Sequence, residues 1–312
     1  MKELSTINFK VSDKGVGKIT LSRPEKHNAM NRQMIDELKV VASQITASHN
    51  IRLVILSAEG QTFCAGGDLN WMKEQEKKPK EGKLVEAKAL ATMLGSMNSL
   101  PVPLLTIVEG NAFGGGLGLI AVSDTVISAS NAKFGLTETR LGLIPATIGP
   151  FVMKKLGESY GRNLFFSGKI FDAMTAHKSG LIHYFCEDTQ EIETLVDSEI
   201  SNIMKCAPGA IRKSKELSQK LSGERPEEFL DLTINILADS WESKEGKEGI
   251  KAFFEKSART RLMLEFSLYN DNPIQPLPHP RSSTFIPSKS RFLVTSIINS
   301  LSGLGSNTVP ST

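Results

Sequence analysis

Short apolar runs and amphipathic stretches alternate through the first half of this 312-residue chain. Apolar and polar residues alternate over 7–11 and 16–21, with a Ser-Asp-Lys-Gly turn between them, which predicts a strand hairpin. From Asn31 onward apolar residues recur at helical spacing with charged residues opposite, so we expect an amphipathic helix. Continuous apolar runs at 53–56 and 104–108 predict buried strands.

Each of these two buried strands is followed by a Gly-rich turn and then a helix. The first turn is Phe63-Cys64-Ala65-Gly66-Gly67-Asp68-Leu69, with Asp68 as the expected N-cap, and the second is Gly114–Gly118. The recurrence at a spacing of about fifty residues favours stacked ββα units over a doubly wound sheet. Between the two units, the Lys/Glu/Gly-rich segment 73–83 is expected to be mobile and solvated, and 84–98 to be a helix.

The C-terminal half has a different character. The pattern after Pro150 is mainly helical to about residue 257. The last 47 residues, 266–312, hold six of the fourteen prolines, ten serines and a single acid, Asp271. That composition predicts a disordered extension outside the fold.

Composition and charge exclude several classes of function. A net charge of +3, without an interleaved basic–aromatic stripe, argues against a nucleic-acid partner. No apolar run approaches the length of a membrane span and no targeting segment is visible at Met1, so no membrane partner and a cytoplasmic location are expected. Three separate cysteines without a C-x-x-C pair indicate neither a disulfide framework nor a metal site.

The candidate chemistry lies in the two Gly-rich turns and in Glu138. Backbone N–H groups at the two turns could hold a negatively charged oxygen, and a carboxylate in an apolar pocket would have a raised pKa and could move protons beside it. Taken singly, each turn could be a tight connection and Glu138 a surface residue. The histidines are scattered singly, as surface or packing residues would be.

A dinucleotide site is the competing interpretation of the second turn. Gly116, Gly118 and Ala121 fit a G-x-G-x-x-A pattern, but such a site needs an acid at the end of the next strand. Ser130 and Asn131 occupy that point, so the pattern disfavours a nucleotide-binding sheet.

Taken together, the motifs resemble the enoyl-CoA hydratase/isomerase (crotonase) family over about residues 5 to 256. The resemblance implies an α/β fold, a crotonase-like spiral of ββα units with a helical C-terminal trimerisation region, and assembly as a homotrimer or hexamer. On this basis we expect a core over 1–195, a helical region over 196–265 and the extension 266–312. The motifs that carry the resemblance are Leu21-Ser22-Arg23-Pro24-Glu25-Lys26-His27-Asn28-Ala29-Met30, Phe63 to Leu69, Pro103 to Gly118, Phe134 to Pro145, and Phe171 to Ala176 with Gly180-Leu181-Ile182.

The resemblance also implies an acyl-CoA thioester substrate, with CoA as part of the substrate and no separate cofactor or metal. It implies that Glu138 is catalytic and that the N–H groups of Gly67 and Gly115 form the oxyanion hole. The residues implied to contact the substrate are Lys26, His27, Ala65, Asp68, Leu69, Gly118, Phe253 and Lys256.

One departure from the family pattern affects the expected reaction. Hydratases of the family commonly carry a second glutamate shortly after the Gly-rich turn, where this chain has Gly118. A single carboxylate suits a Δ3,Δ2-enoyl-CoA isomerase, whereas the stretches 114–119 and 141–150 look most like methylglutaconyl-CoA and isohexenylglutaconyl-CoA hydratases of leucine and terpene catabolism. We therefore expect a hydratase, with Arg140 as a candidate partner for a substrate carboxylate. An isomerase and a non-catalytic CoA- or macromolecule-binding protein are the alternatives.

Overall fold

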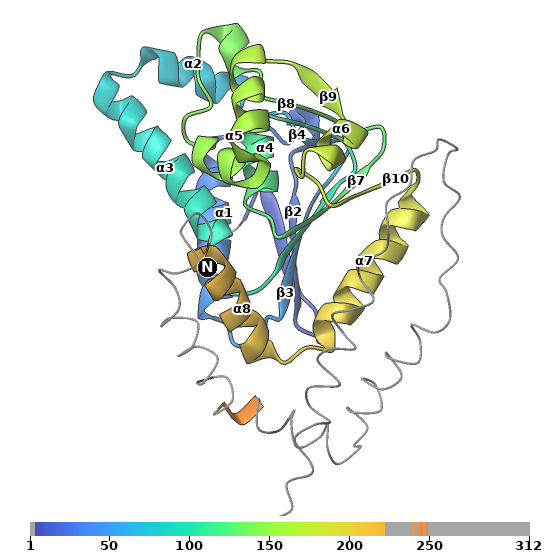
Figure 1. The fold of residues 1–312 in the computed structure, drawn as a ribbon. Coiled ribbons are helices and arrows are strands. Elements are labelled where there is room, and N and C mark those ends of the chain that lie inside the picture. The colour runs from blue at the N-terminus through green and yellow to red at the C-terminus, as the bar shows by residue number, and fades with distance from the viewer. Residues whose placement is uncertain (1–3, 222–238, 240–242, 246–247, 249–312) are drawn as a thin grey trace, which may run out of the picture. The chain divides into compact units, whose positions relative to one another are not determined.

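Six strands form a sheet at the centre of the protein, and its inner strands β3, β5 and β7 are buried along most of their length (Figure 1). The computed structural model describes residues 4–221, 239, 243–245 and 248. The strand order is β1-β2-β3-β5-β7-β10, and every neighbouring pair is parallel except the predicted hairpin β1–β2. The strands are β1 (Ile7–Val11), β2 (Val16–Leu21), β3 (Leu53–Ala58), β5 (Leu104–Val108), β7 (Thr125–Ala129) and β10 (Tyr184–Cys186).

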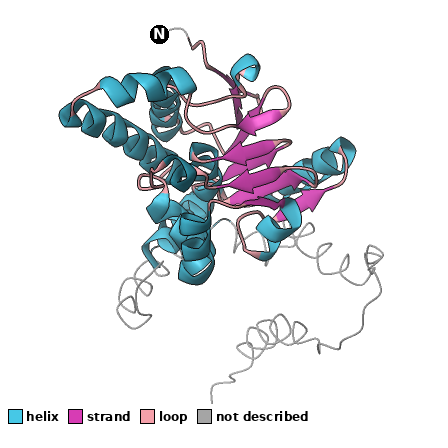
Figure 2. Cartoon of the chain, turned by 90° about the horizontal axis from the view of Figure 1, so that it is seen from above, coloured by secondary structure: helices cyan, strands magenta, loops and turns pink. Residues whose placement is uncertain are grey.

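Both faces of this sheet are covered by helices, as Figure 2 shows. Within β3, Val54 and Leu56 belong to the main hydrophobic core, while Leu53 and Ile55 belong to a second core on the opposite side. A buried strand in a parallel sheet is apolar on both sides for this reason. The helices are α1 (Arg32–Ala47), α2 (Leu69–Lys77), α3 (Lys80–Asn98), α4 (Gly115–Ala121), α5 (Gly149–Ser167), α6 (Ala173–Lys178), α7 (Thr189–Met204) and α8 (Pro208–Leu221), with 3-10 turns η1 (Pro24–Lys26) and η2 (Glu138–Leu141).

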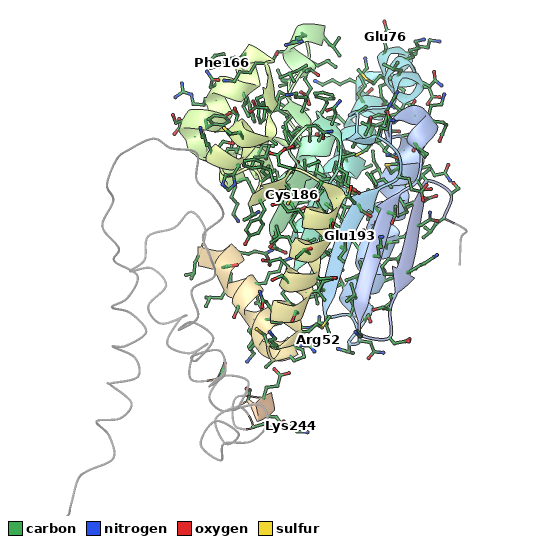
Figure 3. The ribbon with its side chains drawn as sticks, turned by 90° about the vertical axis from the view of Figure 1, so that its right-hand side faces the viewer. Arg52, Glu76, Phe166, Cys186, Glu193 and Lys244 are labelled. Carbon is green, nitrogen blue, oxygen red and sulfur yellow. The ribbon has the colours of Figure 1, made fainter. Side chains whose placement is uncertain are left out.

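The amphipathic helix predicted from Asn31 is α1, and the Asn31 side chain caps it by accepting from the N–H of Met34. Its apolar face is fully buried in the main core. On the other side of the sheet, α7 packs its buried Ile192 and Val196 against the second core. Arg52, at the lower end of the sheet in Figure 3, donates to the carbonyls of Met204 and Cys206 and so holds the end of α7.

A second, smaller sheet carries the features on which function depends. Its order is β4-β6-β8-β9, with β4, β6 and β8 parallel and β9 antiparallel to β8. Because carboxyl ends of parallel strands meet at one edge, the segments that follow β4, β6 and β8 are brought together. The strands are β4 (Thr62–Cys64), β6 (Asn111–Phe113), β8 (Lys133–Gly135) and β9 (Ile170–Asp172).

The expectation of a mobile segment at 73–83 was wrong. These residues form the end of α2 and the start of α3, separated only by Lys78 and Pro79. The Lys/Glu side chains suggested solvation, but Glu86 lies buried and binds one cation of this segment, Lys78. The region after Pro150 is also less uniformly helical than expected, because it contributes β9 and β10 to the two sheets.

The domain boundary expected after residue 195 falls inside α7, and the described residues lie within one compact unit that ends at residue 250. The predicted extension 266–312 lies outside the described residues. Among the helices in the described part of the chain, none has the length and apolar character needed to cross a bilayer.

Candidate active site

The two Gly-rich turns and Glu138 converge at the carboxyl edge of the small sheet. The first turn follows β4, the second follows β6, and Glu138 opens η2 after β8. The turns touch, because a Cβ added to Gly114 would lie 3.7 Å from the Cα of Gly66 and 3.2 Å from Oε1 of Glu138. Positive φ angles at Gly66 (95°) and Gly114 (48°) explain why both turns require glycine.

Two backbone N–H groups at this edge have no acceptor. Gly67 forms a bridge with Met30, yet the bonds of that bridge use the flanking groups: Met30 donates to the carbonyl of Gly66, and Asp68 donates to the carbonyl of Met30. Gly115 is the first residue of α4, where an N–H has no partner inside the helix. Among the described residues, no hydrogen bond uses the N–H of Gly67 or Gly115. The pair is therefore available to an oxygen of a bound molecule.

Glu138 supplies the titratable group beside these donors. Its Oε2 is buried and has no hydrogen-bond partner in the described structure. Burial raises the pKa of the Glu138 carboxyl above its usual value. A partly desolvated carboxylate with one unpaired oxygen is characteristic of a group that exchanges protons with a ligand.

Asp68 has a structural role at this site. It caps α2 by accepting from the N–H groups of Asn70 and Trp71, and it forms an ion pair of 2.9 Å with Arg23. Burial opposes its ionisation, but these donors outweigh that effect and the pKa of Asp68 lies below its usual value. Arg23 also donates to the carbonyl of Ala29, which connects the first Gly-rich turn to the segment before α1.

The segment Arg23–Asn28 forms one wall of the same edge. Asn28 is fully buried with φ 51°, and its side chain bonds to Arg23 N–H and to the carbonyls of Glu59 and Thr62. This places the exposed Lys26 and His27 next to Ala65, whose N–H donates to the His27 carbonyl. Ala65 and Leu69 are exposed as well, so this wall is open to solvent.

Gly118 lies apart from the open edge, buried in α4. A Cβ added there would lie 2.7 Å from Cγ2 of Ile148 and 3.4 Å from Cδ1 of Leu94. The place of a second glutamate is therefore filled by apolar side chains.

Sequence reasoning missed three neighbours of the site. Met30 reaches Gly115, since an added Cβ would lie 2.8 Å from its terminal methyl group. Cys64 packs against Gly116. Burial raises the pKa of the Cys64 thiol to about 11, so the thiol stays protonated. Ile148 covers Gly118. Met30 and Cys64 stand within the quoted motifs, but only packing reveals their contacts. Phe253 and Lys256 lie outside the described residues.

The sequence model of the Enoyl-CoA hydratase/isomerase family matches residues 12–260 of the chain. The chain belongs to this family. Known proteins agree with the assignment: the enoyl-CoA hydratase ACTT6 of Alternaria alternata is 29% identical over 206 residues, which are 66% of this chain and 67% of that protein.

Solved structures of crotonase-fold proteins match the described architecture. An enoyl-CoA hydratase from Shewanella pealeana is 34% identical with a TM-score of 0.79, covering 82% of this chain and 96% of that one. AtuE of Pseudomonas aeruginosa is 33% identical with a TM-score of 0.78, covering 81% and 98%. The α/β fold expected from the motifs is thus confirmed, and the protein is an enzyme of this family. In the described residues, no group of three or more His, Cys, Asp or Glu side chains is arranged to hold a metal ion.

Proposed function

We propose that this enzyme is an enoyl-CoA hydratase in which Glu138 alone carries out both proton transfers of the reaction. The observation that supports this most directly is the unpaired Oε2 of Glu138 close to the N–H groups of Gly67 and Gly115, which are free among the described residues. The thioester oxygen would accept from those two groups. Negative charge that develops on it during the reaction would meet donors already in place.

A single carboxylate is sufficient for the stoichiometry of hydration. As the water oxygen bonds to Cβ of the enoyl group, Glu138 takes one water proton and the thioester becomes an enolate. The resulting carboxylic acid then gives its proton to Cα, the enolate returns to a thioester, and Glu138 is again ionised. The raised pKa of Glu138 suits a group that must accept and then release a proton.

A second candidate, Δ3,Δ2-enoyl-CoA isomerisation, is favoured by one observation: Ile148 and Leu94 close the space around Gly118. In that reaction Glu138 would remove a proton from Cα and return it to Cγ while the double bond moves, and no water would be needed. The same donors would hold the same enolate oxygen.

One experiment separates the two reactions. The enzyme is incubated in deuterated water with crotonyl-CoA, 3-methylglutaconyl-CoA and a 3-enoyl-CoA, and products are analysed by mass spectrometry. Hydration adds one water and leaves a solvent deuteron on Cα; isomerisation moves the double bond without adding water. Glu138→Gln should lower kcat by about 10²–10⁴-fold, whereas the exposed Glu109→Gln should not. Equal activity of wild type and Glu138→Gln, or silence with all three substrates, would contradict the proposal and favour a binding protein.

We further propose a methylglutaconyl-CoA-like substrate and a homotrimeric or hexameric assembly. Arg140 supports the first idea, because it is exposed in η2 two residues after Glu138 and has no acidic partner among the described residues. Arg140→Ala should raise KM for 3-methylglutaconyl-CoA but leave KM for crotonyl-CoA unchanged.

The proposed assembly is supported by apolar surface, because exposed Leu141, Ile144 and Phe166 could contact a second copy. Sedimentation equilibrium measures the assembly.

Lys26 and His27 would border the CoA part of the substrate. Both are exposed and lie beside Ala65, two residues from the Gly67 donor. Lys26→Ala should therefore raise KM for a CoA thioester but not for the matching pantetheine thioester, which lacks the nucleotide phosphates. Equal changes in KM for the two thioesters would show that Lys26 does not contact the nucleotide phosphates.

A further inference from the structure

A buried acid, Glu86 on α3, lies at the point where three helices meet. Its side chain is 10% exposed, and its two oxygens accept from groups on three elements. Lys78, at the joint between α2 and α3, donates over 2.8 Å; Arg32, at the start of α1, lies at 3.2 Å; and the Trp71 indole N–H of α2 donates over 3.2 Å. Burial alone would raise the pKa of Glu86, but these donors outweigh it and the pKa is lowered, so the group is ionised at neutral pH.

One of these three partners also touches the oxyanion pocket. A Cβ added to Gly67 would lie 3.8 Å from Cε3 of Trp71 and 3.4 Å from Cγ and Sδ of Met72, so the first turn of α2 packs directly on Gly67. The Asp68 cap fixes the start of that turn through the N–H of Trp71. At the other end, Glu86 fixes α2 through the Trp71 indole and the Lys78 ammonium.

The position of α2 matters because it is one of two supports of the Gly67 peptide group, the other being the Met30 N–H, which donates to the Gly66 carbonyl in the same peptide plane. The Met30 bond and the side chains of Trp71 and Met72 packed on Gly67 together determine where that N–H points. A preorganised donor is effective when its geometry is fixed before charge develops on the substrate. A shift of α2 would therefore remove one of these two supports and change the direction of the Gly67 N–H.

We propose that Glu86 is a positioning residue for the oxyanion hole, acting through Trp71 on the Gly67 N–H. The proposal rests on the proposed function in that it assigns the Gly67 N–H to the substrate oxygen. Glu86 does not touch substrate. It holds the first turn of α2 against Gly67 while the reaction proceeds at Glu138.

The test is a double-mutant cycle on kcat and KM. Glu86→Ala should lower kcat by about 10-fold, a fraction of the 10²–10³ that follows complete loss of an oxyanion donor, and change KM less than about 2-fold. Trp71→Phe should show part of this loss, and the double variant should lose less than the product of the two single effects, since both act through one contact. Glu86→Gln keeps an acceptor oxygen for the Trp71 indole and should therefore have a kcat closer to that of wild type than Glu86→Ala. It replaces Glu86→Ala in the cycle if that variant fails to fold.

Asp36→Ala is the matched control. Asp36 binds Arg32 over 2.8 Å, so it shares that cation with Glu86, but among the described residues it forms no hydrogen bond with Trp71. Its removal should disturb the same ion cluster without releasing α2. Additive losses in the cycle, or a loss of kcat in Asp36→Ala equal to that in Glu86→Ala, would overturn the proposal.

Hydrogen–deuterium exchange supplies a readout that does not depend on turnover. Peptides covering 65–78 should exchange faster in Glu86→Ala than in wild type and Asp36→Ala, while peptides covering 114–121 stay unchanged. If wild type converts none of the enoyl-CoA substrates, the proposed function fails and exchange alone decides the role of Glu86. Unchanged exchange over residues 65–78 in Glu86→Ala would then contradict the positioning role of Glu86.

Discussion

Glu138 determines the expected pH dependence of the enzyme. The reaction begins with the ionised carboxylate, so kcat/KM should rise with pH as Glu138 loses its proton. Burial raises its pKa, and the midpoint of that rise should therefore lie above the 4.5 of an ordinary glutamate. A profile of kcat/KM from pH 4 to pH 9 measures this. If kcat/KM stayed constant down to pH 4.5, the reaction would not depend on a carboxylate whose pKa is raised above that value.

Gly118 provides a second test at single-residue scale, with Gly95 as its control. Both are helical glycines, but a Cβ at Gly118 would lie 2.7 Å from Ile148, whereas nothing lies within 4 Å of one at Gly95. Gly118→Ala should lower the free energy of unfolding by about 1–3 kcal/mol through overpacking. Gly95→Ala should raise it by about 0.5–1 kcal/mol because alanine favours the helix. Urea unfolding compares them, and similar shifts in the two variants would contradict the packing shown around Gly118.

At this scale the sequence predicted the principal groups but not their supports. Gly67, Gly115 and Glu138 stand in recognisable motifs, and the structure places them at one edge. Ile148 could not be connected with Gly118, thirty residues earlier, because no periodic pattern links a loop residue to the helix it covers. The Glu86–Trp71 contact was hidden for the same reason.

At the scale of elements, one histidine extends the pairing of β10 with β7 beyond the strand itself. The N–H of His183 donates to the Val126 carbonyl, and Nδ1 of His183 accepts from the Val126 N–H over 3.0 Å. That acceptor role requires a neutral ring. Burial, with help from the positive charge of Lys155, lowers the pKa of His183 to about 4.

The stability of the protein should therefore fall as pH decreases from 6.5 to 4. In that window the unfolded chain protonates His183 and the folded chain does not, so the unfolded state binds more protons and stability rises with pH. His183→Asn keeps an acceptor for Val126 and removes the titration. Its unfolding free energy should depend less on pH between 4 and 6.5 than that of wild type, as measured by urea unfolding. Parallel curves for the two proteins would refute the assignment.

Elements were predicted well where apolar periodicity was strong and poorly where charge dominated. The strand hairpin, α1 and the two buried strands follow from patterns of burial that a single chain displays. The segment 73–83 shows the limit, since its lysines and glutamates resemble a solvated loop. Its helices are fixed by the Asp68 cap and by cations bound to Glu86, which are contacts between elements.

At the scale of the whole molecule, α8 joins the core through polar contacts. Its only buried residue in the described structure is Lys215. Lys215 donates to the Val102 carbonyl over 2.9 Å and pairs with Asp124, while Arg212 donates to Ile51 and Gln219 to Asn98. These acceptors lie at the ends of helices and strands from the first ββα unit onward, so α8 connects parts of the chain that are more than ninety residues away.

Lys215→Met should detach α8 while leaving the active site intact. The variant leaves the buried Val102 carbonyl without its donor, at a cost of about 1–3 kcal/mol, although Asp124 keeps the Leu104 N–H as a partner. Lys213→Met, at an exposed position on the same helix, is the control. Hydrogen–deuterium exchange should accelerate in peptides covering 208–221 for Lys215→Met only, with kcat within about 2-fold of wild type. Equal exchange in the two variants would mean that Lys215 does not hold the helix. A large loss of kcat would mean that detachment of α8 disturbs the active site around Glu138. None of the described contacts of α8 predicts such an effect.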